Sequence, residues 1–260
     1  MDPLIKYPGG KRWFVETMKQ WFEPYRATHT FVEPFAGSLA LSLGLEPERV
    51  IANDVNAHVI NFYQQIKNGF HCHREAPLMP EHYYAIRDEF NALIRANEHC
   101  SRKGAELFYI LTKSGFNGLV RFNRSGLFNT PAGRYKKINL CSEFSEYQQL
   151  LKNWQLTVQD FRLMDPKEDW FLVLDPPYHN TFTGYSGLGF NWEDQEDVVE
   201  WVTSYKTGPV IITNSATDEI IRLYRKAGFS CFLREVRRSI SCRGNARQNA
   251  IEVIACKWKN

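Results

Sequence analysis

The feature that most constrains this chain is a run of five apolar residues at 170–174 that leads directly into Asp175-Pro176-Pro177-Tyr178. A short, continuous apolar run is typical of a strand that is buried on both faces of a largely parallel sheet. Residues 209–213 form a second run of this kind. Because ligands of open α/β sheets bind beyond the carboxyl ends of the strands, we expect the tetrapeptide to lie at a binding site.

Helical patterns alternate with short β-branched or aromatic runs, which is typical of an α/β domain. The other predicted strands are residues 30–33, 49–53, 230–236 and 250–256, the last two as an antiparallel pair at the end of the sheet. From about residue 56 to residue 109 the pattern is helical, and Gly and Pro punctuate residues 118–135 as in a β-hairpin. We therefore predict an α/β domain of residues 1–56 and 143–260 with a mostly helical module, residues 57–142, inserted in it.

Length and composition favour a globular protein. With 260 residues and 43% hydrophobic content, the chain can bury a full core. It has neither an apolar stretch of membrane-spanning length nor a leader-like N-terminus, so we expect a soluble, cytoplasmic protein, and we expect it to act as a monomer. The six cysteines are sparse and form no C-x-x-C pair. We interpret them as reduced thiols and expect neither disulfides nor a metal site.

Charged residues are segregated along the chain, although the net charge is only +3. Residues 107–142 carry six basic and no acidic side chains, and residues 222–260 carry ten basic and two acidic ones. Residues 160–200 carry ten acidic and two basic side chains. The first basic segment is interleaved with Phe and Asn, a mixture that nucleic-acid surfaces use. Most such runs are ordinary solvated charge, but this pattern indicates a cationic surface for a polyanion beside a carboxylate-lined pocket.

Three shorter motifs precede the tetrapeptide. Pro8-Gly9-Gly10-Lys11 is a flexible turn before a basic residue; it lacks the spacing of a phosphate-binding loop and is, by itself, more typical of a loop at a helix start. Gly37, in the segment 33–38 between a predicted strand and an apolar helix, lets the backbone approach a bound nucleoside. Asp54 follows the second strand, where a carboxylate can accept both ribose hydroxyls of a cofactor.

The tetrapeptide has a chemical rationale as a site that activates an amine. An adenine amine is a poor nucleophile, because its lone pair is delocalised into the ring. The Asp175 carboxylate and the Pro176 carbonyl can accept its N–H bonds and localise that pair, while the proline stiffens the chain. Tyr178 offers a face on which the base can stack. Positioning of the reactants and fixed electrostatics then suffice for methyl transfer, and no metal is needed. Because base pairing hides the amine within the duplex, the adenine must be flipped out. A rigid Pro-Pro turn is the alternative interpretation.

Taken together, the motifs resemble the Dam-type (D12 class, group alpha) site-specific DNA adenine-N6 methyltransferases, in which a glycine motif precedes an inserted target-recognition domain and D-P-P-Y follows it. The matching residues are 6–11, 35–37, Asp54, 115–123, 128–135, 175–178 and 236–241. D-P-P-Y is shared by many amino methyltransferases, whereas the blocks at 115–123 and 128–135 belong to the branch that resembles GATC-specific enzymes. The resemblance implies a Rossmann-like sheet that uses S-adenosyl-L-methionine, with residues 57–142 recognising double-stranded DNA.

The resemblance also implies roles for individual residues. The catalytic group would be Asp175, Pro176, Pro177 and Tyr178. The cofactor would be contacted by Tyr7, Lys11, Phe35, Gly37, Asp54, Asp160, Phe161 and Asp175. DNA would be contacted by Lys6, Phe116, Asn117, Leu119, Arg121, Asn123, Pro131 and Arg134.

Within the DNA-contacting set, Arg121 would read a guanine through its bidentate fork. Lys6 would touch the first base pair, and Leu119 and Pro131 would lie against a thymine methyl. Phe116 and Asn117 would enter the space that the flipped base leaves. Arg134 would hold a phosphate. Alternatively, Phe116 and Leu119 belong to the core of the hairpin and Arg134 is a solvated charge.

Two positions depart from the family pattern. Ser38-Leu39 follow Gly37 where relatives often have a further glycine, and Tyr7-Pro8 stand where many relatives have Trp and a small residue. These departures leave the fine shape of the cofactor pocket open. The competing hypotheses are an amino methyltransferase of the same fold that acts on RNA or a protein amide, and a catalytically silent DNA-binding protein, which the intact tetrapeptide disfavours. A nicotinamide oxidoreductase is disfavoured because the chain lacks G-x-G-x-x-G.

Overall fold

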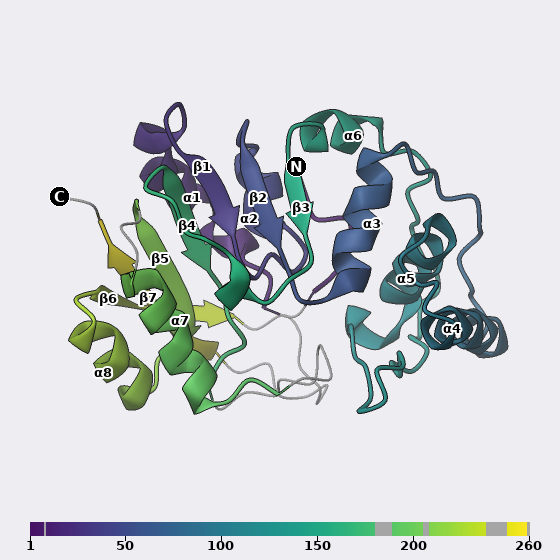
Figure 1. The fold of residues 1–260 in the computed structure, drawn as a ribbon. Coiled ribbons are helices and arrows are strands. Elements are labelled where there is room, and N and C mark those ends of the chain that lie inside the picture. Colours follow the sequence, from purple (N-terminus) through teal and green to yellow (C-terminus); the bar gives the residue numbers. More distant parts are fainter. Residues whose placement is uncertain (8, 180–188, 205–207, 238–248, 259–260) are drawn as a thin grey trace.

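The structure of the chain, a computed structural model, describes residues 1–7, 9–179, 189–204, 208–237 and 249–258. Within these ranges the strands form a seven-stranded sheet in the order β3-β2-β1-β4-β5-β7-β6 (Figure 1). The strands are β1 Thr30–Glu33, β2 Val50–Asn53, β3 Gln155–Thr157, β4 Trp170–Leu174, β5 Val210–Ser215, β6 Ser230–Arg237 and β7 Asn249–Lys257. Pro8, residues 238–241 of the last matching block and Cys242 lie outside the described residues.

The strands β1 to β5 pair in parallel, and β7 runs antiparallel to both β5 and β6. This confirms the α/β class and the antiparallel pair at the end of the sheet, and every predicted strand is present to within two residues at each end. The sequence does not predict β3. Its three residues lie at the sheet edge, are exposed or half-buried, and form no apolar run.

Helices cover both faces of the sheet, and β4 shows why (Figure 1). Its side chains alternate between two cores: Phe171 and Val173 belong to one, Leu172 and Leu174 to the other. This confirms a strand that is buried on both faces. The first core receives side chains from α1 Val15–Phe22, α2 Ala40–Leu45 and α3 Ala57–Lys67, and the second from α7 Trp192–Ser204 and α8 Asp218–Lys226.

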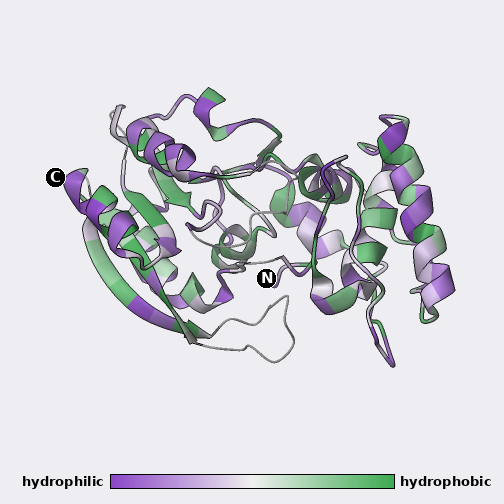
Figure 2. Cartoon of the chain, turned by 90° about the horizontal axis from the view of Figure 1, so that it is seen from below, coloured by the Kyte–Doolittle hydropathy of each residue, from purple (hydrophilic) through white to green (hydrophobic). Residues whose placement is uncertain are grey.

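Within the predicted module, residues 57–142, the part that follows α3 lies to one side of the sheet, and the view from below shows the same arrangement (Figures 1 and 2). Its helices are α4 Pro80–Arg95 and α5 Arg102–Ser114, and α6 Ser145–Leu151 follows the module. Side-chain caps start α3 and α5: Asn56 Oδ1 accepts from the His58 N–H, and Ser101 Oγ accepts from the Gly104 N–H. Phe31 of β1, Phe62 of α3 and Phe108 of α5 belong to one hydrophobic cluster, so the module and the sheet share a core.

Residues 115–135 form an irregular hairpin. Its two arms are joined by isolated antiparallel bridges, Gly115 with Ala132 and Phe122 with Phe128. Side chains also bind backbone groups of both arms. The buried Asn91 of α4 both donates to the Phe128 carbonyl and accepts from the Phe128 N–H, and Thr130 Oγ1 donates to the Leu119 carbonyl. The hairpin is therefore docked on α4.

Short 3-10 turns complete the described structure at Arg12–Phe14, Glu23–Tyr25, Phe116–Gly118 and Phe161–Leu163. The five described cysteines are free. No described helix has the length and apolar character needed to cross a membrane.

Candidate active site

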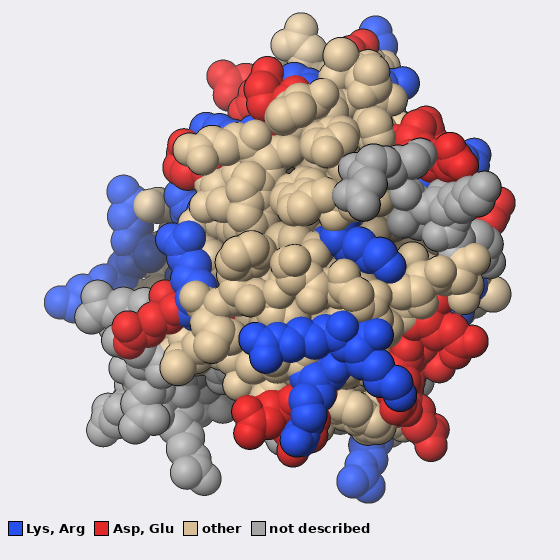
Figure 3. Space-filling model, turned by 90° about the vertical axis from the view of Figure 1, so that its left-hand side faces the viewer, with Lys and Arg blue, Asp and Glu red and all other residues tan. Residues whose placement is uncertain are grey.

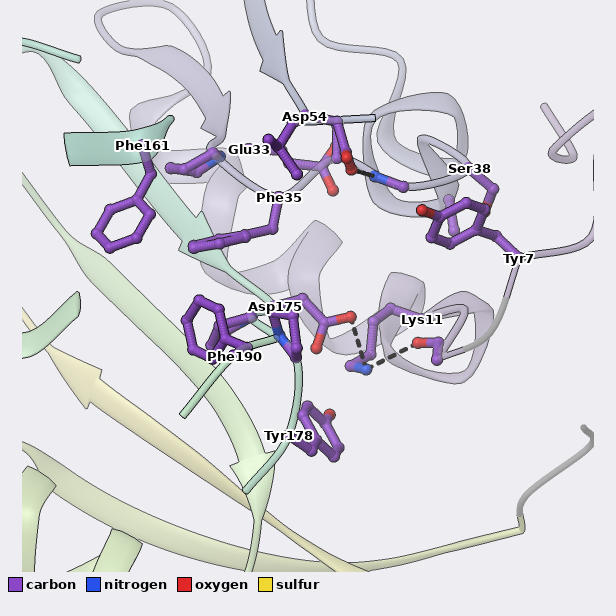
Figure 4. A pocket seen from close by; sticks show the side chains of 18 of the residues that line it. Tyr7, Lys11, Glu33, Phe35, Ser38, Asp54, Phe161, Asp175, Tyr178 and Phe190 are labelled. Carbon is purple, nitrogen blue, oxygen red and sulfur yellow. Dashed lines mark hydrogen bonds and ion pairs between the residues drawn. The ribbon is translucent and has the colours of Figure 1, made fainter. Parts of the chain in front are cut away.

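A pocket of about 400 Å³ opens beyond the carboxyl ends of β1, β2 and β4 (Figure 4). Its lining comes from the N-terminal loop, the turn after β1, the ends of β2 and β3, and the loop after β4. The predicted cofactor-binding and catalytic residues that line it are Tyr7, Lys11, Phe35, Gly37, Asp54, Asp160, Phe161, Asp175, Pro176, Pro177 and Tyr178. The fold thus brings together in one cavity all the residues predicted for these two roles.

The turn after β1 is held against the end of β2. Asp54 accepts hydrogen bonds from the backbone N–H groups of Gly37 and Asn56, each at 2.8 Å. Burial raises the pKa of Asp54, and these two hydrogen bonds oppose that shift. Gly37 has φ +48°, and a Cβ there would lie 3.0 Å from the Tyr7 ring. A side chain at position 37 would therefore strain the backbone and push Tyr7 from the pocket.

Leu39, which follows Gly37 and Ser38, adopts the left-handed conformation with φ 58°. This conformation costs a residue with a Cβ about 1–3 kcal/mol. The Leu39 side chain is fully buried in the main hydrophobic cluster, and this burial offsets the strain. Leu39 is thus tolerated in this conformation because its side chain packs into the core.

Aromatic side chains form one wall of the pocket. The Phe35 ring centroid lies 5.1 Å from that of Phe161 and 6.1 Å from that of Phe190. Asp160 caps the short turn after it, accepting from the Arg162 N–H, and it also pairs with the Arg162 guanidinium at 3.0 Å. The sequence does not single out Phe190, because nothing in its local pattern places it opposite Phe35.

Lys11 lies between Asp175 and Tyr178, as Figure 4 shows. Its Nζ is 2.8 Å from Asp175 Oδ2 and 4.9 Å from the centroid of the Tyr178 ring, and it also donates to the Gly9 carbonyl. The other carboxylate oxygen, Asp175 Oδ1, accepts from Thr213 Oγ1 at 2.7 Å. Lys11 is 3% exposed, so this cation is held inside the pocket, in the space that faces both the carboxylate and the ring.

Two buried amide side chains hold the loop that carries the tetrapeptide through hydrogen bonds to its backbone. Gln195 of α7 donates from Nε2 to the Pro177 carbonyl at 2.8 Å. Asn214 of β5 accepts from the His179 N–H at 3.0 Å and donates to Gln195 Oε1 at 2.9 Å. Sequence reasoning missed both amides. The available signal was the polar sequence Thr213-Asn214-Ser215 at the end of an otherwise apolar strand.

A further residue that sequence reasoning missed is Glu252, which is 6% exposed on β7. Its Oε2 accepts from the Tyr178 hydroxyl at 2.8 Å and lies 3.9 Å from Lys11 Nζ. Burial, followed by the charges of Asp175 and Glu252, raises the pKa of Tyr178 well above its ordinary range. The Tyr178 phenol therefore stays protonated and donates to Glu252.

The pocket is acidic. Its lining contains six carboxylates and two basic side chains, Lys11 and Arg162; the carboxylates are Glu33, Asp54, Asp160, Asp175, Asp194 and Glu252. Burial raises the pKa of Glu33 to about 7. Such a lining favours a ligand that carries positive charge and disfavours a polyphosphate. Among the described residues, no group of three or more His, Cys, Asp and Glu side chains could hold a metal ion.

The predicted DNA-contacting residues lie outside the pocket, on the hairpin and the N-terminal loop. Lys6 and Pro131 are exposed and Phe116 is 37% exposed, whereas Leu119 is only 8% exposed. A Cβ at Gly118, which has φ +65°, would lie 2.6 Å from Lys6 Cδ, so the Lys6 stem packs on the hairpin. The exposed Arg134 lies near the end of the hairpin, and Asn117 adopts a left-handed conformation within it.

Asn123 and Arg121 already have partners within the hairpin. Asn123 Oδ1 accepts from the N–H groups of Ser125 and Leu127, each at 3.0 Å, and thereby shapes the tip. Arg121 is half-buried and hydrogen-bonded to Asn129.

The second basic segment, residues 222–260, does not form a uniformly basic surface in its described part. Exposed basic residues in its described part are Arg222, Arg225, Lys226, Arg234 and Lys257. Figure 3 shows the side of the molecule that includes α8 and the outer strands. Basic groups there stand beside acidic ones and among uncharged surface.

Residues 7–240 match the model of the D12 class N6 adenine-specific DNA methyltransferase family. A DNA N-6-adenine-methyltransferase of Escherichia phage P1 is 32% identical over 96% of this chain, which spans 35% of that relative. The retron Ec67 DNA adenine methylase of Escherichia coli is 30% identical, over 98% of this chain and 91% of the relative. Type II methyltransferase M1.LlaDCHI of Lactococcus lactis subsp. cremoris is also 30% identical, over 100% of this chain and 96% of the relative.

Proposed function

The chain belongs to the D12 class N6 adenine-specific DNA methyltransferases, and on that premise we propose that it transfers the methyl group of S-adenosylmethionine to N6 of a flipped-out adenine in GATC. The observation that carries the proposal is the acidic pocket in which Asp175, Lys11 and Tyr178 meet. We further propose that residues 1–56 and 143–260 perform the transfer and that residues 57–142 recognise the DNA.

The pocket suits S-adenosylmethionine in charge and shape. When bound, this cofactor supplies an electrophilic methyl group on a positively charged sulfur, and the acidic groups of the lining, which outnumber its basic groups, favour a cation. Asp54 has a second acceptor site on each oxygen beyond those used by Gly37 and Asn56, and can receive ribose hydroxyls. Phe35 and Phe161 offer aromatic surface for an adenine ring.

Asp175 and Pro176 are proposed to accept the two N–H bonds of the target amine and to localise its lone pair. Tyr178 would stack against the base, with its ring held by Glu252. Lys11 Nζ lies near both the Asp175 carboxylate and the Tyr178 ring, so Lys11 is proposed to shift when the base enters. The proton that leaves the amine passes to solvent or to Asp175.

The proposal that the substrate is DNA and that the site is GATC rests on the hairpin blocks at 115–123 and 128–135. The tetrapeptide specifies neither the polymer nor the site. Lys6 and the hairpin lie against one another, so one surface can span several base pairs. Arg121 presents a guanidinium for a guanine, while Phe116 is exposed enough to enter a stack from which a base has been flipped.

The proposal is tested with labelled S-adenosylmethionine and three substrates: a duplex containing GATC, a duplex with one base pair of that site changed, and an RNA. We expect label in the GATC duplex alone. Label in RNA but not in DNA would favour the alternative acceptor and overturn the proposal. Equal label in both duplexes would overturn the sequence specificity but leave adenine methylation standing.

A further inference from the structure

Arg121 is held by the residue directly opposite it in the hairpin, Asn129. Arg121 Nε donates to Asn129 Oδ1 at 2.8 Å, and Arg121 Nη2 donates to the Asn129 carbonyl at 3.0 Å. The Asn129 N–H in turn donates to the Arg121 carbonyl at 3.0 Å. Three hydrogen bonds therefore join the two residues, and two of them fix the orientation of the guanidinium.

Asn129 itself stands on anchored backbone. The residue before it, Phe128, has both its N–H and its carbonyl bonded to the buried side chain of Asn91. The residue after it, Thr130, has its carbonyl bonded to the Tyr83 hydroxyl at 3.0 Å. Both Asn91 and Tyr83 lie on α4. The Arg121 guanidinium is thus held in place by Asn129, whose backbone is in turn anchored to α4.

The two contacts also select which edge of the guanidinium is left for a ligand. An arginine has five N–H donors in a planar fork. With Nε and one Nη2 hydrogen directed to Asn129, the remaining donors are those of Nη1 and the second one of Nη2. These lie at the end of the fork, where two parallel N–H groups match O6 and N7 of a guanine in the major groove.

We propose that Asn129 is a specificity-determining residue that acts through Arg121, by presenting the end of its guanidinium to a guanine. The inference rests on the proposed function, because it requires that the hairpin reads DNA. A free arginine side chain samples many rotamers and can reach phosphates or other acceptors. Held by Asn129, Arg121 is ordered before DNA binds, so the effect falls on discrimination between bases more than on overall affinity.

The test is a double-mutant cycle on methylation rates. Rates are measured on the GATC duplex and on each duplex with one base pair changed, for the wild type, Arg121→Ala, Asn129→Ala and the double variant. For each changed base pair, the penalty is the factor by which methylation is slower than on the GATC duplex. The base pair whose penalty disappears in Arg121→Ala is the one that Arg121 reads. Asn129→Ala should lower the penalty at that base pair by about fivefold, the factor expected for one hydrogen bond. It should have no further effect in the Arg121→Ala background.

Asn129→Asp, which keeps a side-chain acceptor for Arg121 Nε, should retain the discrimination and so distinguishes orientation from a folding defect. An equal loss of rate on every duplex, or an Asn129→Ala effect that persists without Arg121, would overturn the inference and indicate a direct phosphate contact. A wild-type protein that labels no duplex would overturn the proposed function, and the inference with it.

Discussion

The Tyr178 hydroxyl donates a hydrogen bond to Glu252 Oε2 at 2.8 Å, and so a residue of β7 orients the ring at the end of the tetrapeptide. Glu252 can hold this position because β7 lies between β5 and β6 within the sheet. A stacking surface for the acceptor base is thus built from two segments that are 74 residues apart.

We predict that Glu252→Ala lowers kcat by about tenfold, because the ring loses its charge-assisted hydrogen bond and no longer holds one orientation. The affinity for S-adenosylmethionine should fall by a smaller factor than kcat, because Glu252 is only one of several carboxylates in the pocket. Glu252→Gln keeps an acceptor for Tyr178 and should retain most of the activity. Single-turnover methylation measures the effect, and equal losses in the two variants would show that the charge of Glu252, not its hydrogen bond to Tyr178, matters.

Asn214→Leu should lower the free energy of unfolding by about 2–4 kcal/mol, because it leaves several buried polar groups without partners. These groups include the His179 N–H and Gln195 Oε1. Urea denaturation measures the loss. The control is Thr203→Val, which removes the hydroxyl of an exposed residue outside this network and should change the free energy by less than about 0.5 kcal/mol. Similar values for the two variants would contradict the role of Asn214.

Glu33 should make the folded protein less stable as the pH rises. Its pKa is raised by burial to about 7, against an ordinary value of 4.5. Between these two values the folded chain holds a proton that the unfolded chain has lost. The contribution of Glu33 to stability is therefore largest below pH 4.5 and decreases as the pH rises to 7.

Glu33→Gln should remove this dependence. From pH 5 to pH 8, the difference in unfolding free energy between wild type and variant should shift by about 2–3 kcal/mol in favour of the variant. Urea titrations at several pH values measure it. Parallel stability curves for the two proteins would show that Glu33 does not titrate in this range.

The sequence predicts the strands of the sheet well, because apolar runs such as 170–174 have few alternatives to burial on both faces. It predicts less of the hairpin, where Asn91 of α4 takes the backbone groups of Phe128. That interaction joins residues 37 positions apart, and no local pattern specifies it.

The candidate site, too, contains contacts between distant residues that no local sequence pattern specifies. Asp175 and Asp54 are predictable because each follows a strand directly, Gly37 because it lies in the turn after a strand, and parallel strands end at one edge of the sheet. Glu252 looks like a solvent-facing residue of an alternating strand, and only the pairing of β7 with β5 brings it to Tyr178. Gln195 likewise reaches Pro177 from a helix whose acidic sequence indicates an exposed face.

The most direct test of the account is nucleoside analysis of a GATC duplex after incubation with S-adenosylmethionine and either the wild type or Asp175→Ala. We expect N6-methyladenine with the wild type and none with the variant, while a binding assay shows that the variant still holds the duplex. Near-normal formation of N6-methyladenine by Asp175→Ala would contradict the assignment of Asp175 as the group that activates the amine.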